Sequence, residues 1–292
     1  MRVFGENLSY IDYNMSSGKS RYILALILTL SAVAIIGGAR ADEPAIWRQL
    51  DSGLDIACFA VTTESVVTDS ALTIVRIDPD KWEFKLMCRS RTEDNENLTA
   101  RQWCEKYHLV AAVNAGMFQQ DYTTHVGYVN IGGQVISGRV RSYLSAVAFG
   151  PKRDGLAPFR IFDLDRDSVA DITRDYETVC QNMRLIARPG ENKWSQQDRQ
   201  WTEVALGEDD KGRALLIHCG RALPMHDFNE LLLSLPIGVV TAQHLEGGAE
   251  AQLYLKDKEF EIERLGSFGI GSGSDNAIAY PIPNVIGISR KK

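Results

Sequence analysis

The stretch that most limits what this chain can fold into is Thr241–Leu255, TAQHLEGGAEAQLYL. Apolar and polar residues alternate over Val239–Glu246, which predicts a β-strand with one buried face. Gly247 and Gly248 end this strand, and the small residues after them predict a sharp turn into a helix. Such a turn exposes backbone N–H groups and one strand-end side chain in a cleft. That side chain is Glu246, with His244 on the same strand face, so we expect the chemistry here.

Short strand-like segments dominate the rest of the chain. Leu54–Val61, Ala71–Asp78 and Trp82–Cys88 are rich in β-branched and aromatic residues, which favours strands. Gly132-Gly133 predicts a two-residue hairpin, and Thr99 with Gln102 predicts a capping box for a helix over residues 100–107. Neither regular βαβ alternation nor an internal repeat is visible. The pattern predicts an α+β fold, a single domain built on a mixed β-sheet with a few short helices.

Residues 1–41 differ in character from the rest. Lys19 and Arg21 precede the apolar run Tyr22–Ile36, and Ala39-Arg40-Ala41 supplies an A-x-A pattern. This arrangement predicts a secretory signal peptide cleaved after Ala41, which leaves residues 42–292 as the mature domain. The alternative is an uncleaved membrane anchor over residues 22–39, because the run is close to the ~17–25 residues that span a bilayer. Both interpretations predict export of the domain, to the periplasm or the extracellular space.

The charge and the cysteine content of the chain limit the classes of partner and of site that it can have. The formal net charge is −6, and residues 1–41 carry four basic and two acidic side chains, so the mature chain carries −8. An acidic exported chain without a basic run argues against nucleic acid as a partner. The five cysteines contain no C-x-x-C pair of the kind found in metal and redox sites. One or two disulfides and a set of buried free thiols both fit this pattern.

Two polar segments have more than one interpretation. Asn114 follows the short apolar strand Leu109–Val113, where its amide either enters a cleft or satisfies turn backbone. Asp163, Asp165 and Asp167 resemble the start of a calcium loop, but the Gly and Glu of an EF-hand are missing further on. We therefore expect Asp163–Asp175 to be a solvated face. No cofactor is predicted and no metal spacing is firm, although a divalent cation beside Glu246 stays compatible with the sequence.

Five blocks of sequence, taken in order, carry a resemblance to a known family. They are Asn114-Ala-Gly-Met-Phe118 with Val126-Gly-Tyr-Val-Asn-Ile131; Gln181-Asn-Met-Arg-Leu-Ile186; Ala205-Leu-Gly207 with Asp210-x-Gly212-Arg-x-Leu-Leu-Ile217 and His226-Asp-Phe228; Leu245-Glu-Gly-Gly248; and Pro283-Asn-Val-Ile-Gly287. Together they resemble the phosphodiester glycosidase family, over roughly Leu50 to Ile288. No single block decides the match, and their order and spacing make it specific.

The resemblance implies a hydrolase acting on a sugar-1-phosphodiester, with release of the sugar and of a phosphomonoester. A carbohydrate phosphodiester would then be the partner of the protein. One departure stands out, because the family's fourth block is commonly Leu-Asp-Gly-Gly followed by Ser. Here Glu246 replaces the Asp and Ala249 replaces the Ser. The carboxylate is kept one methylene further out, so the change bears first on substrate identity and second on activity.

The candidate catalytic residues are Glu246, Asn114 and His244. Glycosyl transfer to water passes through an oxocarbenium-like state that a carboxylate stabilises, and Glu246 is our candidate for it. The alternative is a strand-end Glu that pairs with an arginine or caps the next helix. His244 and His125 would carry protons or donate hydrogen bonds, although a lone histidine is more often structural.

The candidate substrate-binding residues are chosen for a phosphate leaving group. Arg184 and Arg188 lie four apart, on one strand face if the strand continues, and their guanidinium groups match phosphate. Surface or Asp-paired arginines are the alternative. Gly247 and Gly248 would donate backbone N–H groups to the phosphate, unless they form a plain tight turn. Met117, in the first block, joins this set through the resemblance.

A second function from another class also fits the sequence. The Asp-to-Glu change and the missing Ser suit a non-catalytic envelope module that binds sugar-phosphate polymers. That module would bind ligand without turnover, whereas the hydrolase would release product. A Ser/His/Asp hydrolase fits less well, because the chain has no G-x-S-x-G motif.

Overall fold

Antiparallel strands build most of the described structure. The computed structural model describes residues 46–63, 66–267 and 278–291, all within one unit, Glu43–Lys292. Across this part of the chain every strand pairing is antiparallel. The predicted mixed sheet is therefore wrong. Antiparallel strands can be joined by short hairpins, as β2–β3, β13–β14 and β16–β17 are here, whereas parallel pairs need crossover connections of a dozen or more residues.

The largest sheet has eight strands in the order β1-β2-β3-β14-β13-β15-β11-β12. β15, the strand that ends at the diglycine, is hydrogen-bonded on both sides, to β13 and to β11. The bounds in sheet order are β1 (Arg48–Asp51), β2 (Leu54–Thr63), β3 (Val66–Ile77), β14 (Ala214–Pro224), β13 (Gln200–Asp209), β15 (Val239–Gly247), β11 (Arg184–Ala187) and β12 (Glu191–Asn192).

Two five-stranded sheets complete the body. One has the order β7-β6-β10-β8-β9, and its β6–β7 hairpin turns at Gly132-Gly133 as predicted. Its bounds are β7 (Gln134–Ser137), β6 (Val129–Ile131), β10 (Tyr176–Asn182), β8 (Ser145–Pro151) and β9 (Phe159–Asp163). The other has the order β17-β16-β5-β18-β4, with bounds β17 (Phe260–Leu265), β16 (Gln252–Asp257), β5 (Ala111–Asn114), β18 (Asn284–Arg290) and β4 (Trp82–Cys88).

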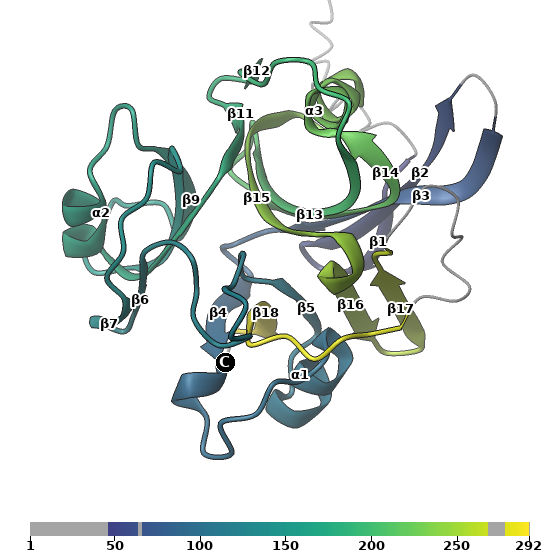
Figure 1. Cartoon of the computed structure of the whole chain (residues 1–292). Helices are drawn as coiled ribbons and strands as arrows, with labels where there is room; N and C mark the ends of the chain where they lie inside the picture. Colours follow the sequence, from purple (N-terminus) through teal and green to yellow (C-terminus); the bar gives the residue numbers. More distant parts are fainter. Residues whose placement is uncertain (1–45, 64–65, 268–277, 292) are drawn as a thin grey trace, which may run out of the picture. The chain divides into compact units, whose positions relative to one another are not determined.

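Short helices lie on these sheets, as predicted (Figure 1). α1 (Ala100–Tyr107) contacts β5 and has the predicted capping box, in which Thr99 and Gln102 bond each other's backbone. α2 (Val169–Asp175) packs on β10 and interrupts the segment that we expected to be only a solvated face. α3 (Met225–Ser234) packs on β11 and β14. Two 3-10 turns, η1 (Arg89–Arg91) and η2 (Gly248–Glu250), complete the described helices.

The eight-stranded sheet separates two apolar cores. Alternation along β3 and β13 sends Val75 and Val204 into one core and Ile74 and Ala205 into the other. The first core extends to the two five-stranded sheets, and the second lies under α3. Because both faces of the sheet are covered, successive residues of β13 from Thr202 onward and of β14 up to Cys219 are buried without alternation.

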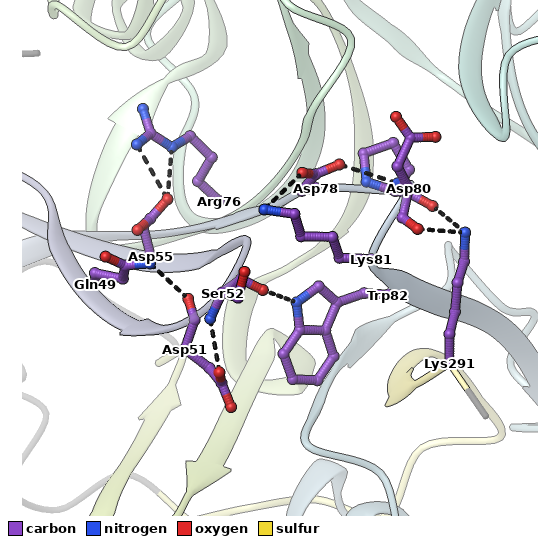
Figure 2. Close-up of polar contacts among 11 residues, drawn as sticks. Gln49, Asp51, Ser52, Asp55, Arg76, Asp78, Asp80, Lys81, Trp82 and Lys291 are labelled. Atoms are coloured by element: carbon purple, nitrogen blue, oxygen red, sulfur yellow. Dashed lines mark hydrogen bonds and ion pairs between the residues drawn. The ribbon is translucent and has the colours of Figure 1, made fainter.

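Hydrogen bonds join the β1–β2 turn to the start of β4 and the end of the described chain to the β3–β4 turn (Figure 2). The indole N–H of Trp82 donates to the carbonyl of Ser52 at 3.0 Å. Lys291, just after β18, donates to the carbonyls of Pro79 and Asp80 at 2.8 and 2.9 Å. These bonds fix the end of the fold opposite the diglycine strand tip, so they support the fold rather than a site.

The segment after Gly248 differs from the prediction. The expected helix is a single 3-10 turn, Gly248–Glu250, and the chain then enters β16. The physical reason is tertiary, because Asn114 binds both sides of this turn through its side chain, to the carbonyl of Glu250 and the N–H of Gln252. The Glu250 carbonyl and the Gln252 N–H are therefore hydrogen-bonded to the Asn114 side chain instead of to helix backbone.

Two other sequence expectations meet the structure here. All five cysteines are free, and all but Cys58 are buried. The predicted signal peptide or anchor, residues 1–41, lies outside the described residues. Within the described ranges, no helix has the length and apolar character needed to cross a bilayer.

Candidate active site

A cleft of about 520 Å³ opens where β15 ends. It brings together five residues that the sequence singled out: Glu246, His244, Gly247, Gly248 and Met117. The other lining residues are Met183, Arg199, Gln200, Trp201 and Ser267. The cleft therefore contains the strand-end carboxylate on which the sequence analysis depends.

Glu246 carries the carboxylate at the tip of β15. It pairs with Val204 of β13, and its Oε1 accepts the backbone N–H of Gly247 at 3.0 Å. Burial raises the pKa of Glu246 to about 7, with Glu250 and Glu203 adding to the rise and His244 and the Gly247 N–H opposing it. A carboxyl group with this pKa can take up or release a proton near neutral pH.

His244 forms a buried pair with Glu203, a residue that the sequence analysis missed. Nδ1 of His244 lies 2.5 Å from Oε1 of Glu203, and both side chains are almost fully buried. Burial disfavours a charged His244, but the attraction and hydrogen bond of Glu203, helped by Glu246, raise its pKa above the ordinary value. Burial also raises the pKa of Glu203, against the opposing effect of His244. The one signal in the sequence is that Glu203 directly precedes the apolar run Val204–Leu206.

Trp201 forms a wall of the cleft and is fixed from two sides. Its indole N–H donates to Oε2 of Glu203 at 2.9 Å. Its ring also lies against Gly247, where an added Cβ would come within 2.6 Å of Trp201 Cδ1. Gly247 is thus required by close approach, and Gly248 by its positive φ of 72°. The aromatic face gives a sugar ring an apolar surface to stack on.

Arg199 is the cationic group of the cleft. Its guanidinium carbon lies 5.2 Å from the Trp201 ring centroid, a cation–π distance. Within the described part of the chain it forms no ion pair with a carboxylate. It is therefore available to an anionic group of a ligand. Sequence reasoning did not single it out, because it lies in a polar loop without a recognisable pattern.

Glu250 and Tyr122 border Glu246. The hydroxyl of Tyr122 donates to Oε1 of Glu250 at 3.1 Å, and this bond raises the pKa of Tyr122, with Glu246 contributing to the same rise. Tyr122 is 43% exposed and has a φ of 52°, which is unusual for a bulky residue. Because it acts electrostatically on Glu246, the carboxylate of Glu250 belongs to the surroundings of the site.

Comparison with known proteins identifies the family to which this chain belongs. Residues 107–289, more than half of the chain, match the phosphodiester glycosidase family. The chain belongs to the phosphodiester glycosidase family. No curated protein sequence matches it at a significant level.

Solved structures share the fold of this family member at low identity. The catalytic domain of zebrafish N-acetylglucosamine-1-phosphodiester alpha-N-acetylglucosaminidase, auto-inhibited by its pro-peptide, superposes with a TM-score of 0.60 and 15% identity, over 86% of each chain. A hypothetical protein from Synechocystis superposes with a TM-score of 0.52 and 14% identity, over 82% of this chain and 62% of its own.

Asn114 does not reach the cleft of this phosphodiester glycosidase. It is buried at the end of β5, and its side chain binds only backbone: Nδ2 donates to the Glu250 carbonyl at 2.9 Å, and Oδ1 accepts from Gln252 at 2.8 Å. The catalytic assignment is therefore corrected to a positioning role, in which Asn114 fixes the turn that follows the diglycine.

His125 is a core residue rather than a ligand-binding one. Its Nδ1 lies 3.3 Å from the amide nitrogen of Asn284, and its Nε2 lies 3.3 Å from the carbonyl of Gln181. Burial lowers the pKa of His125 to about 4, so the ring is neutral at physiological pH. Gly116 explains the tight packing, since an added Cβ there would meet the His125 ring at 2.5 Å.

The two predicted phosphate arginines lie outside the cleft. Arg184 starts β11 and binds Asp163 and Asp165, each at 2.6 Å. Arg188 lies beyond the end of β11, at a cis bond to Pro189, and pairs with the buried Glu208 at 2.7 Å. Carboxylates thus neutralise both arginines, and Arg199 replaces them as the candidate phosphate ligand.

The described ranges also bear on the divalent cation that the sequence left open. No three His, Cys, Asp or Glu side chains converge there in a way that could hold an ion. Asp163 and Asp165, which resembled a calcium loop in the sequence, are occupied by Arg184.

Proposed function

We propose that this protein hydrolyses a sugar-1-phosphodiester to a free sugar and a phosphomonoester. The observation that carries the proposal is Glu246, a carboxyl group with a pKa raised to about 7, at a strand tip in a cleft beside a buried His–Glu pair. Membership of the phosphodiester glycosidase family supports the same reaction class.

The geometry suggests a division of roles. The sugar stacks on Trp201, with its C1 carbon facing Glu246, and Arg199 holds the phosphate. The C1–O bond breaks and its electron pair leaves with the phosphate, a weak base that needs little proton assistance. The oxygen of water bonds to C1, and ionised Glu246 accepts the proton of that water. Protonated His244, held by Glu203, keeps Glu246 partly ionised, because a nearby positive charge favours a carboxylate.

The test uses hydrolysis in water labelled with oxygen-18. The purified protein is incubated with a panel of glycosyl phosphodiesters, and free sugar and phosphomonoester are measured by mass spectrometry. The proposal predicts product with the label on the sugar, because C1–O is the bond that breaks. Label on the phosphate would show a phosphodiesterase instead. Ligand binding without product across the panel would show a non-catalytic envelope module.

We also propose that the domain is exported. The support is the basic, apolar and small-residue order of residues 1–41, which matches a secretory signal. Residues 22–39 would tether the domain to the membrane if the signal is not cleaved. N-terminal sequencing of the mature protein tests this, with Asp42 expected as the first residue. An intact residue 1 on a cytoplasmic protein would contradict export.

A further inference from the structure

A second cavity of about 580 Å³ lies next to the Glu246 cleft. The two share Met183, the residue at which the chain passes from β10 into β11. The backbone carbonyl of Met183 accepts the N–H of His244 at 2.8 Å, so this residue borders both the cavity and the catalytic cleft. The volume is within the ~300–1,000 Å³ typical of ligand sites.

The cationic groups of the second cavity are already neutralised. Arg184 is only 10% exposed and its guanidinium contacts both Asp163 and Asp165 at 2.6 Å. Lys193 forms an ion pair with Glu191. Two positive charges therefore face at least three negative ones. An anionic ligand would have to displace these pairs, so the cavity favours a neutral ligand.

The remaining lining groups suit a ligand rich in hydroxyl groups. The indole N–H of Trp194 donates to the carbonyl of Arg184 at 2.8 Å, which fixes the orientation of its ring. Gln197 has a buried amide nitrogen without a hydrogen-bond partner in the described structure. Tyr143 and Ser142 add hydroxyl groups from the segment just before β8. An aromatic face beside amides and hydroxyls can bind a sugar ring through its apolar face and its rim.

We propose that this cavity binds a neutral sugar unit of the substrate, adjacent to the phosphodiester that Glu246 cleaves. The proposal deepens the proposed function and rests on it. The substrate is then longer than one sugar and one phosphate, with the extra unit on either the glycosyl side or the aglycone side. Met183 separates that unit from the reacting C1 carbon.

A binding experiment tests the subsite without turnover. Phosphate-free disaccharides of gluco, galacto and manno configuration are titrated into wild-type protein, with tryptophan fluorescence and calorimetry as readouts. We expect at least one to bind, and Trp194→Ala to weaken its binding about 5–150-fold, the loss that corresponds to a stacked aromatic contact of about 1–3 kcal/mol. Gln197→Ala is the second variant in which disaccharide binding should weaken. Its amide nitrogen has no hydrogen-bond partner to lose, so this substitution should leave the fold intact. Inorganic phosphate is the comparison ligand and should not compete with the disaccharide.

A kinetic experiment identifies the side on which the sugar lies. Hydrolysis is compared for a methyl phosphodiester of a monosaccharide, the same ester extended by a sugar on the glycosyl side, and the ester extended on the aglycone side. One extension should raise kcat/KM in wild type, and Trp194→Ala should remove that preference. Equal kcat/KM for all three substrates, with no disaccharide bound, would overturn the subsite and leave the proposed hydrolase intact. Trp194-dependent binding without any hydrolysis would support the subsite and refute the enzyme.

Discussion

Glu203 and His244 form a buried pair between two neighbouring strands, with Oε1 of the glutamate 2.5 Å from Nδ1 of the histidine. The other oxygen of Glu203 accepts the indole N–H of Trp201. One carboxylate on β13 therefore fixes both the charged group beside Glu246 and the aromatic wall of the cleft. In this account Glu203 is a positioning residue, because it acts through His244 and Trp201.

Glu203→Gln should narrow the pH range of activity from both sides. The neutral amide no longer raises the pKa of His244, so His244 loses its proton at lower pH. Losing the His244 charge raises the pKa of Glu246 by more than losing the Glu203 charge lowers it, because His244 has the larger effect on Glu246. We expect kcat/KM to fall about 10–100-fold, the size expected for losing a hydrogen bond to a charged group. A pH–rate profile checks this, with Glu259→Gln, an exposed turn residue, as the matched control. If the acidic and basic limbs of the pH–rate profile both coincide with those of the wild type, Glu203 is only structural.

Glu246 should make the protein less stable as pH rises. Its pKa is about 7 in the folded state against an ordinary 4.5, so between these values the folded state binds more protons and the free energy of unfolding falls with pH. Glu246→Gln removes this dependence. At pH 8 the variant should be more stable than wild type, by no more than about 3 kcal/mol, and at pH 4 the two should nearly agree. Urea unfolding at both pH values measures the difference, and equal stability at pH 8 would contradict the buried carboxylate.

Arg199→Ala should weaken binding of the phosphodiester. Losing a charge-assisted hydrogen bond of about 1.5–3 kcal/mol lowers kcat/KM by about 10–100-fold. The remaining activity should also depend less on salt, because one exposed charge no longer contributes. Arg166→Ala, an exposed arginine in the turn before α2, is the control and should leave kcat/KM unchanged. An Arg199→Ala enzyme with wild-type kcat/KM would show that a group other than Arg199 binds the phosphate.

Gly247→Ala should displace Trp201. The added methyl group would come within 2.6 Å of Trp201 Cδ1 and 3.2 Å of the Thr202 carbonyl, so the ring must move. Overpacking of this kind costs about 1–3 kcal/mol of stability, and a displaced Trp201 also raises KM. Thermal unfolding and steady-state kinetics measure the two effects. Gly138→Ala, where the nearest atom would lie 3.7 Å away, should change neither.

The sequence predicted features that depend on near neighbours. The Thr99 capping box and the Gly132-Gly133 hairpin both formed as expected, because their partners lie within a few residues. The strand tip at Glu246 also formed, and its diglycine is required by the approach of Trp201 to Gly247 and by the positive φ of Gly248. The helix expected after Gly248 did not form, because Asn114, far away in the chain, binds the backbone of that turn.

The composition of the site was harder to predict for the same reason. Glu203 lies 41 residues from His244, and only the pairing of β13 with β15 brings them together. Arg184 matched the expected pattern for a phosphate ligand. Asp163, at the end of β9 in another sheet, and Asp165, just after it, form ion pairs with Arg184 and neutralise its charge. Arg199 belongs to no recognisable sequence pattern, and the loop that leads into β13 places it in the cleft. Local patterns therefore predicted the strand-tip position of Glu246, and tertiary contacts determine which side chains surround it.

The most direct test of the account is turnover of a glycosyl phosphodiester substrate by wild type and Glu246→Gln, measured as sugar released under single-turnover conditions. The account predicts a loss of about 10²–10⁴-fold in the rate, as expected for removing a positioned acid or base, with Glu259→Gln unchanged. A Glu246→Gln protein that releases sugar at the wild-type rate would contradict it.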